Sequence, residues 1–157
     1  ASTFTTADLN AMNTAVLPII RRLNPTRIVF FGGLKFMNPS WVIGNPNALQ
    51  IPSNDTQLML EIHNYDPYKY AGPNPTVHSW GSQNDIAALN KWMDEIGEWS
   101  KEKGLLIYYG EWGCTTTQTK ATGRYEWYKQ HAVSIRSHGF AASVWDGELL
   151  GGFFYFF

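Results

Sequence analysis

The stretch LLIYYGEWG, residues 105–113, carries the strongest indication of how this chain folds. Its first five residues are apolar or aromatic and favour a buried β-strand. The run ends at Gly110 and Glu111, and the glycines at 110 and 113 allow the backbone to turn and a ligand to approach closely. We therefore expect Glu111 at the C-terminal tip of a strand, with Trp112 presenting a flat apolar face beside it. The alternative is a turn glutamate without a role.

Apolar runs elsewhere predict three more strands, separated by helical patterns. Strands are expected at 27–31, 58–62, 105–110 and 140–144. Helices are expected at 5–23, 85–103 and 123–137, the last with core contacts at Tyr125, Tyr128, Ala132 and Ile135. Residues 34–56 are rich in Pro, Asn, Gly and Ser and are predicted to form a long loop without a helix. Because continuous apolar strands alternate with helices, the fold class is α/β with a parallel sheet.

Composition and charge exclude several classes of protein. The net charge is −1, from 12 basic and 13 acidic residues, so no nucleic-acid partner is expected. No apolar run is long enough to span a bilayer, and the N-terminus shows no signal peptide. The lone Cys114 excludes an internal disulfide and is expected to be a buried, unreactive residue. We expect no metal or other cofactor, because His63 and His78 lie apart without a set of partners.

Three predicted strand ends form a recognisable series: His63-Asn64-Tyr65, then Gly110-Glu111-Trp112-Gly113, then Val144-Trp145-Asp146. In order and spacing they resemble strands five to eight of glycoside hydrolase family 5, the cellulase and endoglucanase family. The resemblance implies that residues 1–157 form a single glycosidase domain, half of a TIM (β/α)8 barrel. A complete barrel needs about 250 residues, more than the 157 present.

The resemblance also implies roles for individual residues. Glu111 corresponds to the catalytic nucleophile, and His63 and Tyr65 correspond to a pair that lines the site, with Tyr65 hydrogen-bonded to the nucleophile. Trp145 corresponds to the tryptophan platform for the sugar, and Trp41 to a further subsite ring. The implied substrate is a β-1,4- or mixed-linkage glucan, cleaved with retention of configuration, and the implied location is extracellular. Core packing is the alternative for Trp145, and a hydrogen-bonded core pair is the alternative for His63 and Tyr65.

The sequence departs from the family pattern at the second catalytic group. The family carries its acid/base glutamate in an Asn-Glu-Pro motif at the end of strand four, and no Asn-Glu-Pro occurs here. Four barrel strands alone would leave two sheet edges and an inner face uncovered. We expect two copies to close one barrel as a homodimer, with the aromatic run 153–157 as a dimer contact. Glu148 or Asp146 of the second copy would then serve as the acid/base for Glu111.

Two other hypotheses stay open at this level. The chain could be a non-catalytic carbohydrate-binding half-barrel that keeps its aromatic platforms but lacks a competent acid. It could also be a truncated or engineered fragment that needs its other half supplied in trans.

Overall fold

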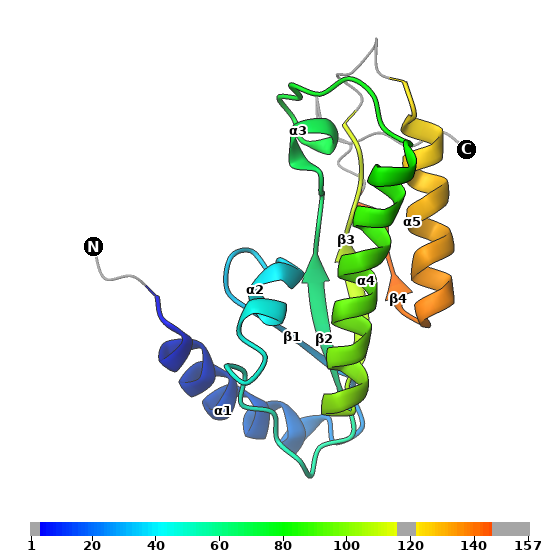
Figure 1. Ribbon diagram of the computed structural model, residues 1–157. Coiled ribbons are helices and arrows are strands. Elements are labelled where there is room, and N and C mark those ends of the chain that lie inside the picture. The colour runs from blue at the N-terminus through cyan, green and yellow to red at the C-terminus, as the bar shows by residue number, and fades with distance from the viewer. Residues whose placement is uncertain (1–3, 116–121, 146–157) are drawn as a thin grey trace.

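The computed structural model describes residues 4–115 and 122–145, and its helices and strands alternate as the sequence predicts (Figure 1). The elements are α1 (Thr6–Leu23), β1 (Val29–Gly32), α2 (Pro39–Gly44), β2 (Leu58–His63), α3 (Tyr68–Ala71), α4 (Gln83–Lys103), β3 (Leu106–Glu111), α5 (Arg124–His138) and β4 (Ala141–Ala142). The four strands are all parallel and lie in the order β1-β2-β3-β4. Spatial order therefore equals chain order, as it does for consecutive strands of a (β/α)8 barrel.

The long helices begin and end at residues suited to those positions. Thr5 and Asp8 form a capping box at the start of α1, in which the Asp8 N–H donates to Thr5 Oγ1 at 3.2 Å and the Thr5 N–H donates to Asp8 Oδ2 at 2.8 Å. Ser82 and Asp85 form the same box at the start of α4. Helix α4 ends at Gly104, whose φ of 65° is open to glycine at little cost. Local signals thus set the helix ends that the sequence predicts.

Segment 34–56 corrects the expectation of a loop without a helix, because α2 lies within it. The Asn38 side chain accepts a hydrogen bond from the Ser40 N–H at 2.9 Å, and Pro39 occupies the first turn. Asn at the cap and Pro in the first turn favour a helix start, a signal hidden among the other Pro and Asn residues. Strand β4 is also shorter than the predicted 140–144.

Helix α5 turns a different face to the core from the one predicted. The expected contacts Tyr125 and Ala132 are exposed, whereas Trp127 and His131 are fully buried. Ser134 is buried as well. Of the expected contacts, only Ile135 is buried, and Tyr128 is half-buried. Apolar periodicity predicted the extent of the helix but the wrong buried face, because two of the buried residues, His131 and Ser134, are polar.

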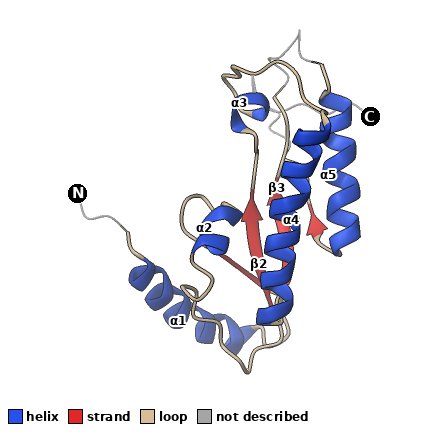
Figure 2. Cartoon of the chain, in the orientation of Figure 1, coloured by secondary structure: helices blue, strands red, loops and turns tan. Residues whose placement is uncertain are grey.

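Among the described residues, helices cover one face of the sheet, and the other face is partly exposed. Helices α4 and α5 lie side by side along the sheet (Figure 2), and the side chains of Leu60, Ile62 and Ile107 are buried on that side. On the opposite face, Phe30, Met59 and Leu106 occupy one row of the strand register. Leu106 is 66% exposed, and Phe30 is exposed although its ring stacks on Tyr108 at 4.5 Å. This second face is the one that lines the inside of a closed barrel, and among the described residues it exposes Phe30 and Leu106, whereas Met59 between them is 8% exposed.

Helix α1 lies at the β1 end of the sheet (Figure 1), and most of its apolar residues are exposed. Met12, Val16, Ile19 and Leu23 form an exposed apolar row along the helix, which we call the α1 stripe, and Leu23 is 71% exposed. Among the described residues, no helix combines the length and apolar character required to cross a bilayer.

Candidate active site

The ends of β2 and β3 bring His63 and Glu111 together. The two residues are register partners, with an irregularity between Ile62 and His63 that lets both strands end level. Beyond the strands, the Asn64 N–H donates to the Glu111 carbonyl oxygen at 3.0 Å. Since the strands are parallel, both side chains stand at the C-terminal edge of the sheet, the edge where α/β folds place their ligands.

Tyr65 follows Asn64 along the chain, and its side chain contacts Glu111. Its hydroxyl donates to Glu111 Oε2 at 2.9 Å, which is the contact that the family resemblance implies. Burial raises the pKa of Tyr65 well above its ordinary value, and the hydrogen bond to Glu111 raises that pKa further. The hydroxyl therefore keeps its proton and acts as a donor that stabilises an ionised Glu111.

His63 lies between two carboxylates. Its Nδ1 is 3.5 Å from Glu111 Oε2, and its Nε2 is 3.1 Å from Glu61 Oε1. All three side chains are partly buried. Glu61 and His63 are two positions apart on β2 and so share one face of the sheet. Sequence reasoning missed Glu61, although this spacing was available as a signal.

Trp112 does not present its ring to a ligand, contrary to the expectation from its place beside Glu111. The ring is buried and stacks on His131, with centroids 5.9 Å apart and planes 10° from parallel. Trp127 lies 3.7 Å from the same imidazole. Trp112 therefore belongs to an aromatic cluster beneath the site, because alternation along the strand end turns it away from the side on which Glu111 points.

The two proposed sugar platforms lie in different settings. Trp145 is 43% exposed. Its backbone N–H donates to the Trp112 carbonyl oxygen at 2.9 Å, which ties it to the segment that carries Glu111. Trp41 lies on α2, half-buried, with its ring against Gly33 just beyond β1. A Cβ on Gly33 would stand 2.4 Å from that ring. The structure thus brings His63, Tyr65 and Glu111 into contact and places Trp41 after β1, while the sugar-binding roles stay predictions.

Three other sequence predictions concern residues around this site. Cys114 is fully buried, as expected, and desolvation raises the pKa of its thiol to about 11, which disfavours the reactive thiolate. The candidate acids Asp146 and Glu148 lie outside the described residues, as does the aromatic run 153–157.

Comparison with known proteins agrees with these features. The family model for cellulase, glycosyl hydrolase family 5, matches residues 2–148. Endoglucanase H of Acetivibrio thermocellus is 31% identical over 147 residues, which cover 94% of this chain and 15% of that protein. The crystal structure of the cellulose synthase subunit Z of Clostridioides difficile superposes with a TM-score of 0.82 at 26% identity, covering 96% of this chain and 50% of that one.

The endoglucanase Cel5A of Thermotoga maritima shares the fold, with a TM-score of 0.83 at 20% identity over 94% of this chain. The chain spans 49% of that structure and only a small part of the curated relatives that it matches. Its four parallel strands are half of a TIM barrel, and the strand ends that carry Glu111, His63 and Tyr65 fall within the matched residues. The chain belongs to the cellulase family, glycosyl hydrolase family 5.

Proposed function

We propose that this chain hydrolyses β-1,4- or mixed-linkage glucans with retention of configuration, and that Glu111 is the nucleophile. The observation that carries the proposal is the Tyr65 hydroxyl 2.9 Å from Glu111 Oε2, at the C-terminal ends of the strands. A retaining glycosidase needs one carboxylate that stays ionised. Membership of the cellulase family supports the β-glucan substrate. Since such glucans are extracellular polymers, we infer that the chain acts outside the cell.

The reaction has two steps. A Glu111 oxygen attacks the anomeric carbon and forms an ester bond as the glycosidic C–O bond breaks, while an acid gives its proton to the departing oxygen. Water then attacks the anomeric carbon, gives a proton to the same acid/base group, and releases Glu111 as a carboxylate. His63 and Tyr65 line the site beside the anomeric carbon. Trp145 and Trp41 stack on sugar rings.

The first experiment isolates the nucleophile from the missing acid. A 2-deoxy-2-fluoro-β-glycoside with a dinitrophenolate leaving group needs no protonation to depart and leaves a slowly hydrolysed ester. We expect intact-protein mass spectrometry to show one sugar added per chain, on Glu111. Glu111→Gln should show no adduct, and Glu98→Gln, on an exposed face of α4, should react like the wild type. A wild-type protein that binds cello-oligosaccharides without forming this adduct would support the carbohydrate-binding half-barrel instead.

For the second carboxyl group, we propose that a homodimer supplies it across the interface, as Glu148 or Asp146 of the second copy. Retaining glycosidases hold their two carboxyl groups about 5–5.5 Å apart. In the part of the chain that the structure describes, β1 and β4 are the edge strands of the sheet, so the β4 edge of one copy can pair with the β1 edge of the other and close a ring of eight. The tip of the partner's last strand would then stand where the family has its acid.

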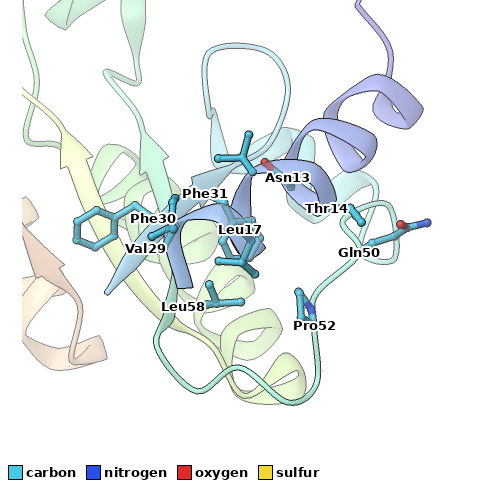
Figure 3. A pocket seen from close by; sticks show the side chains of 11 residues that line it. Asn13, Thr14, Leu17, Val29, Phe30, Phe31, Gln50, Pro52 and Leu58 are labelled. Carbon is cyan, nitrogen blue, oxygen red and sulfur yellow. The ribbon is translucent and has the colours of Figure 1, made fainter. Parts of the chain in front are cut away.

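The α1–β1 region supports an interface of this kind. A groove of about 150 Å³ runs between α1 and β1, lined by Leu17, Val29, Phe31 and Leu58 (Figure 3). Phe30 also lines the groove, although its ring lies on the side away from Leu17 and Leu58 in Figure 3. Together with the α1 stripe, these features leave an apolar surface that a second copy would cover.

A mixing experiment tests whether the two acids come from different copies. Glu111→Gln and a Glu148→Gln, Asp146→Asn double variant should each be inactive on a glucan. After co-refolding in equal amounts, half of the dimers are mixed, and each mixed dimer holds one intact site. We therefore expect about a quarter of the wild-type activity. If the mixture stays inactive, or light scattering finds only monomers, the second copy does not supply the acid to Glu111. That result would favour the hypothesis of a fragment that needs its other half supplied in trans.

A further inference from the structure

Glu61 stands beneath the proposed nucleophile, in contact with His63 but not itself at the tip of a strand. Its register partners are Gly32 on β1 and Tyr108 on β3, two rows below the row of His63 and Glu111. Within the described part of the chain, its carboxylate has one hydrogen-bond partner, His63 Nε2 at 3.1 Å. A carboxylate on the inward face of a strand, partly buried, needs such a partner.

Gly110 makes the room that Glu61 needs. A Cβ on Gly110 would stand 2.3 Å from Glu61 Oε1 and 3.0 Å from its carboxyl carbon, closer than real contacts allow. The glycine next to Glu111 therefore serves the carboxylate beneath it as well as the turn. Strand β3 thus leaves a gap that is filled by a side chain of β2.

The two ring nitrogens of His63 are not equivalent in this arrangement. Nε2 lies within hydrogen-bond distance of Glu61, whereas Nδ1 is 3.5 Å from Glu111 Oε2, beyond a good hydrogen bond. Glu111 already accepts the closer donor, the Tyr65 hydroxyl. Which imidazole nitrogen carries a proton is decided by the hydrogen bond that the other one makes.

We propose that Glu61 is a positioning residue: it keeps a proton on His63 Nε2, so that Nδ1, facing Glu111, carries the lone pair of the neutral ring. Without Glu61, a neutral ring moves its proton to Nδ1 and donates it to Glu111. That would place a second donor on the Oε2 atom that already accepts the Tyr65 hydroxyl, so the carboxylate would have to give up two hydrogen bonds instead of one as it attacks. The catalytic consequence rests on the proposed function, whereas the position of the proton does not.

The test follows the imidazole nitrogens directly. The protein is labelled with ¹⁵N-histidine, and the ring signals of His63 are assigned by their loss in His63→Gln. In the wild type, at a pH where the ring is neutral, we expect Nε2 to give the signal of a protonated nitrogen and Nδ1 that of a bare one. Glu61→Ala should reverse or mix the two signals. Glu61→Gln should retain the wild-type pattern, because its amide oxygen can still accept the Nε2–H.

A second variant reaches the same point without altering Glu61. Gly110→Ala should push the Glu61 carboxylate away from its place and reproduce the Glu61→Ala signals. The control Glu98→Gln changes the same chemical group on an exposed face of α4 and should leave His63 unaltered. An unchanged pattern of His63 signals in both Glu61→Ala and Gly110→Ala would overturn the proposal.

Kinetics supply the second readout. Because Glu61 lies below His63, its loss should lower kcat about tenfold with KM nearly unchanged, and Glu61→Gln should recover most of the activity. If the ring signals shift as expected in a protein that forms no glycosyl adduct, the positioning role stands and the proposed hydrolysis fails. A KM that rises with kcat unchanged would mean that Glu61 binds sugar and does not act through His63.

Discussion

The tips of β2 and β3 differ from the surface around α1 in how far the chain itself satisfies or covers their side chains. At the tips, polar groups satisfy one another within the chain: Tyr65 donates to Glu111, and Glu61 pairs with His63. Helix α1 is also fixed by polar contacts, since Arg21 forms a two-pronged ion pair with Asp55 at 2.6 and 3.1 Å. Its apolar side chains, however, face outward along the α1 stripe. The edge that carries the proposed nucleophile, which we call the catalytic edge, is therefore built from within this chain, whereas the α1 surface reaches ordinary burial only when something covers it.

The largest effect should come from charging that surface. Ile19→Glu places a carboxylate on the α1 stripe, where the side chain is exposed in a single copy. In one copy the change should alter stability by no more than about 0.5 kcal/mol. In a dimer it buries an unpaired charge at a cost of about 3–5 kcal/mol, which weakens association at least 100-fold. Analytical ultracentrifugation across a dilution series measures the shift.

The matched control is Ala88→Glu, on an exposed face of α4 away from both sheet edges. It should leave the association constant unchanged. Equal association of Ile19→Glu and wild type would show that the α1 stripe is not the interface, and the contrast between the two regions would lose its functional meaning.

The same contrast separates what the sequence could predict from what it could not. The strand tips were predictable because glycines mark the ends of apolar runs, and this placed Glu111, His63 and Tyr65 at one edge. The burial of Trp112 was not, because it depends on His131 of α5, 19 positions later, whose polarity hides the buried face of that helix. Glu61 was missed because a carboxylate within a strand is ordinarily a solvent-facing residue. Only the gap at Gly110 and the ring of His63 explain its place.

The aromatic cluster beneath the catalytic edge should make stability depend on pH. His131 is fully buried, and desolvation lowers the pKa of its imidazole to about 3. Its Nδ1 is 2.8 Å from the Trp127 carbonyl oxygen, so that nitrogen donates and the ring stays neutral. Below about pH 6.5 the unfolded chain takes up a proton that the folded chain refuses. The free energy of unfolding is therefore unaffected by protonation of His131 well above that pH, and it decreases as the pH falls toward 3.

The expected loss is up to about 1.4 kcal/mol per pH unit, or about 3 kcal/mol between pH 6.5 and 4. Urea unfolding of wild type and His131→Phe at a series of pH values measures it. The variant should lack this part of the slope, whatever its stability at neutral pH. Parallel slopes in the two proteins would mean that water reaches the imidazole and that the base of the catalytic edge is more open than its packing indicates.

Tyr65→Phe should have a smaller effect, confined to the catalytic edge. The variant keeps the ring and removes the hydroxyl that donates to Glu111. A hydrogen bond to a charged group contributes about 1.5–3 kcal/mol, so kcat/KM should fall about 10-fold to 100-fold. The control Tyr108→Phe removes a hydroxyl that is 2.8 Å from Ser143 Oγ. Similar losses from the two variants would remove the special standing of the Tyr65–Glu111 contact.

The smallest effect concerns the turn that joins the two regions. Lys35, Phe36 and Met37 follow β1 with φ values of 58°, 59° and 59°, a left-handed turn of three non-glycine residues. The Met37 carbonyl oxygen accepts the His63 N–H at 2.9 Å, so the turn is attached to the catalytic edge. Phe36 is 93% exposed and loses little packing when replaced.

Phe36→Gly should therefore raise the free energy of unfolding by about 0.5–1 kcal/mol, because glycine adopts positive φ without the clash between Cβ and carbonyl. Phe36→Ala keeps the Cβ and should give no such gain, which separates backbone strain from loss of the ring. Denaturant unfolding measures both variants. A gain in Phe36→Ala equal to that in Phe36→Gly would attribute the effect to removing an exposed aromatic. If only glycine stabilises the protein, the gain comes from relief of the positive φ at Phe36.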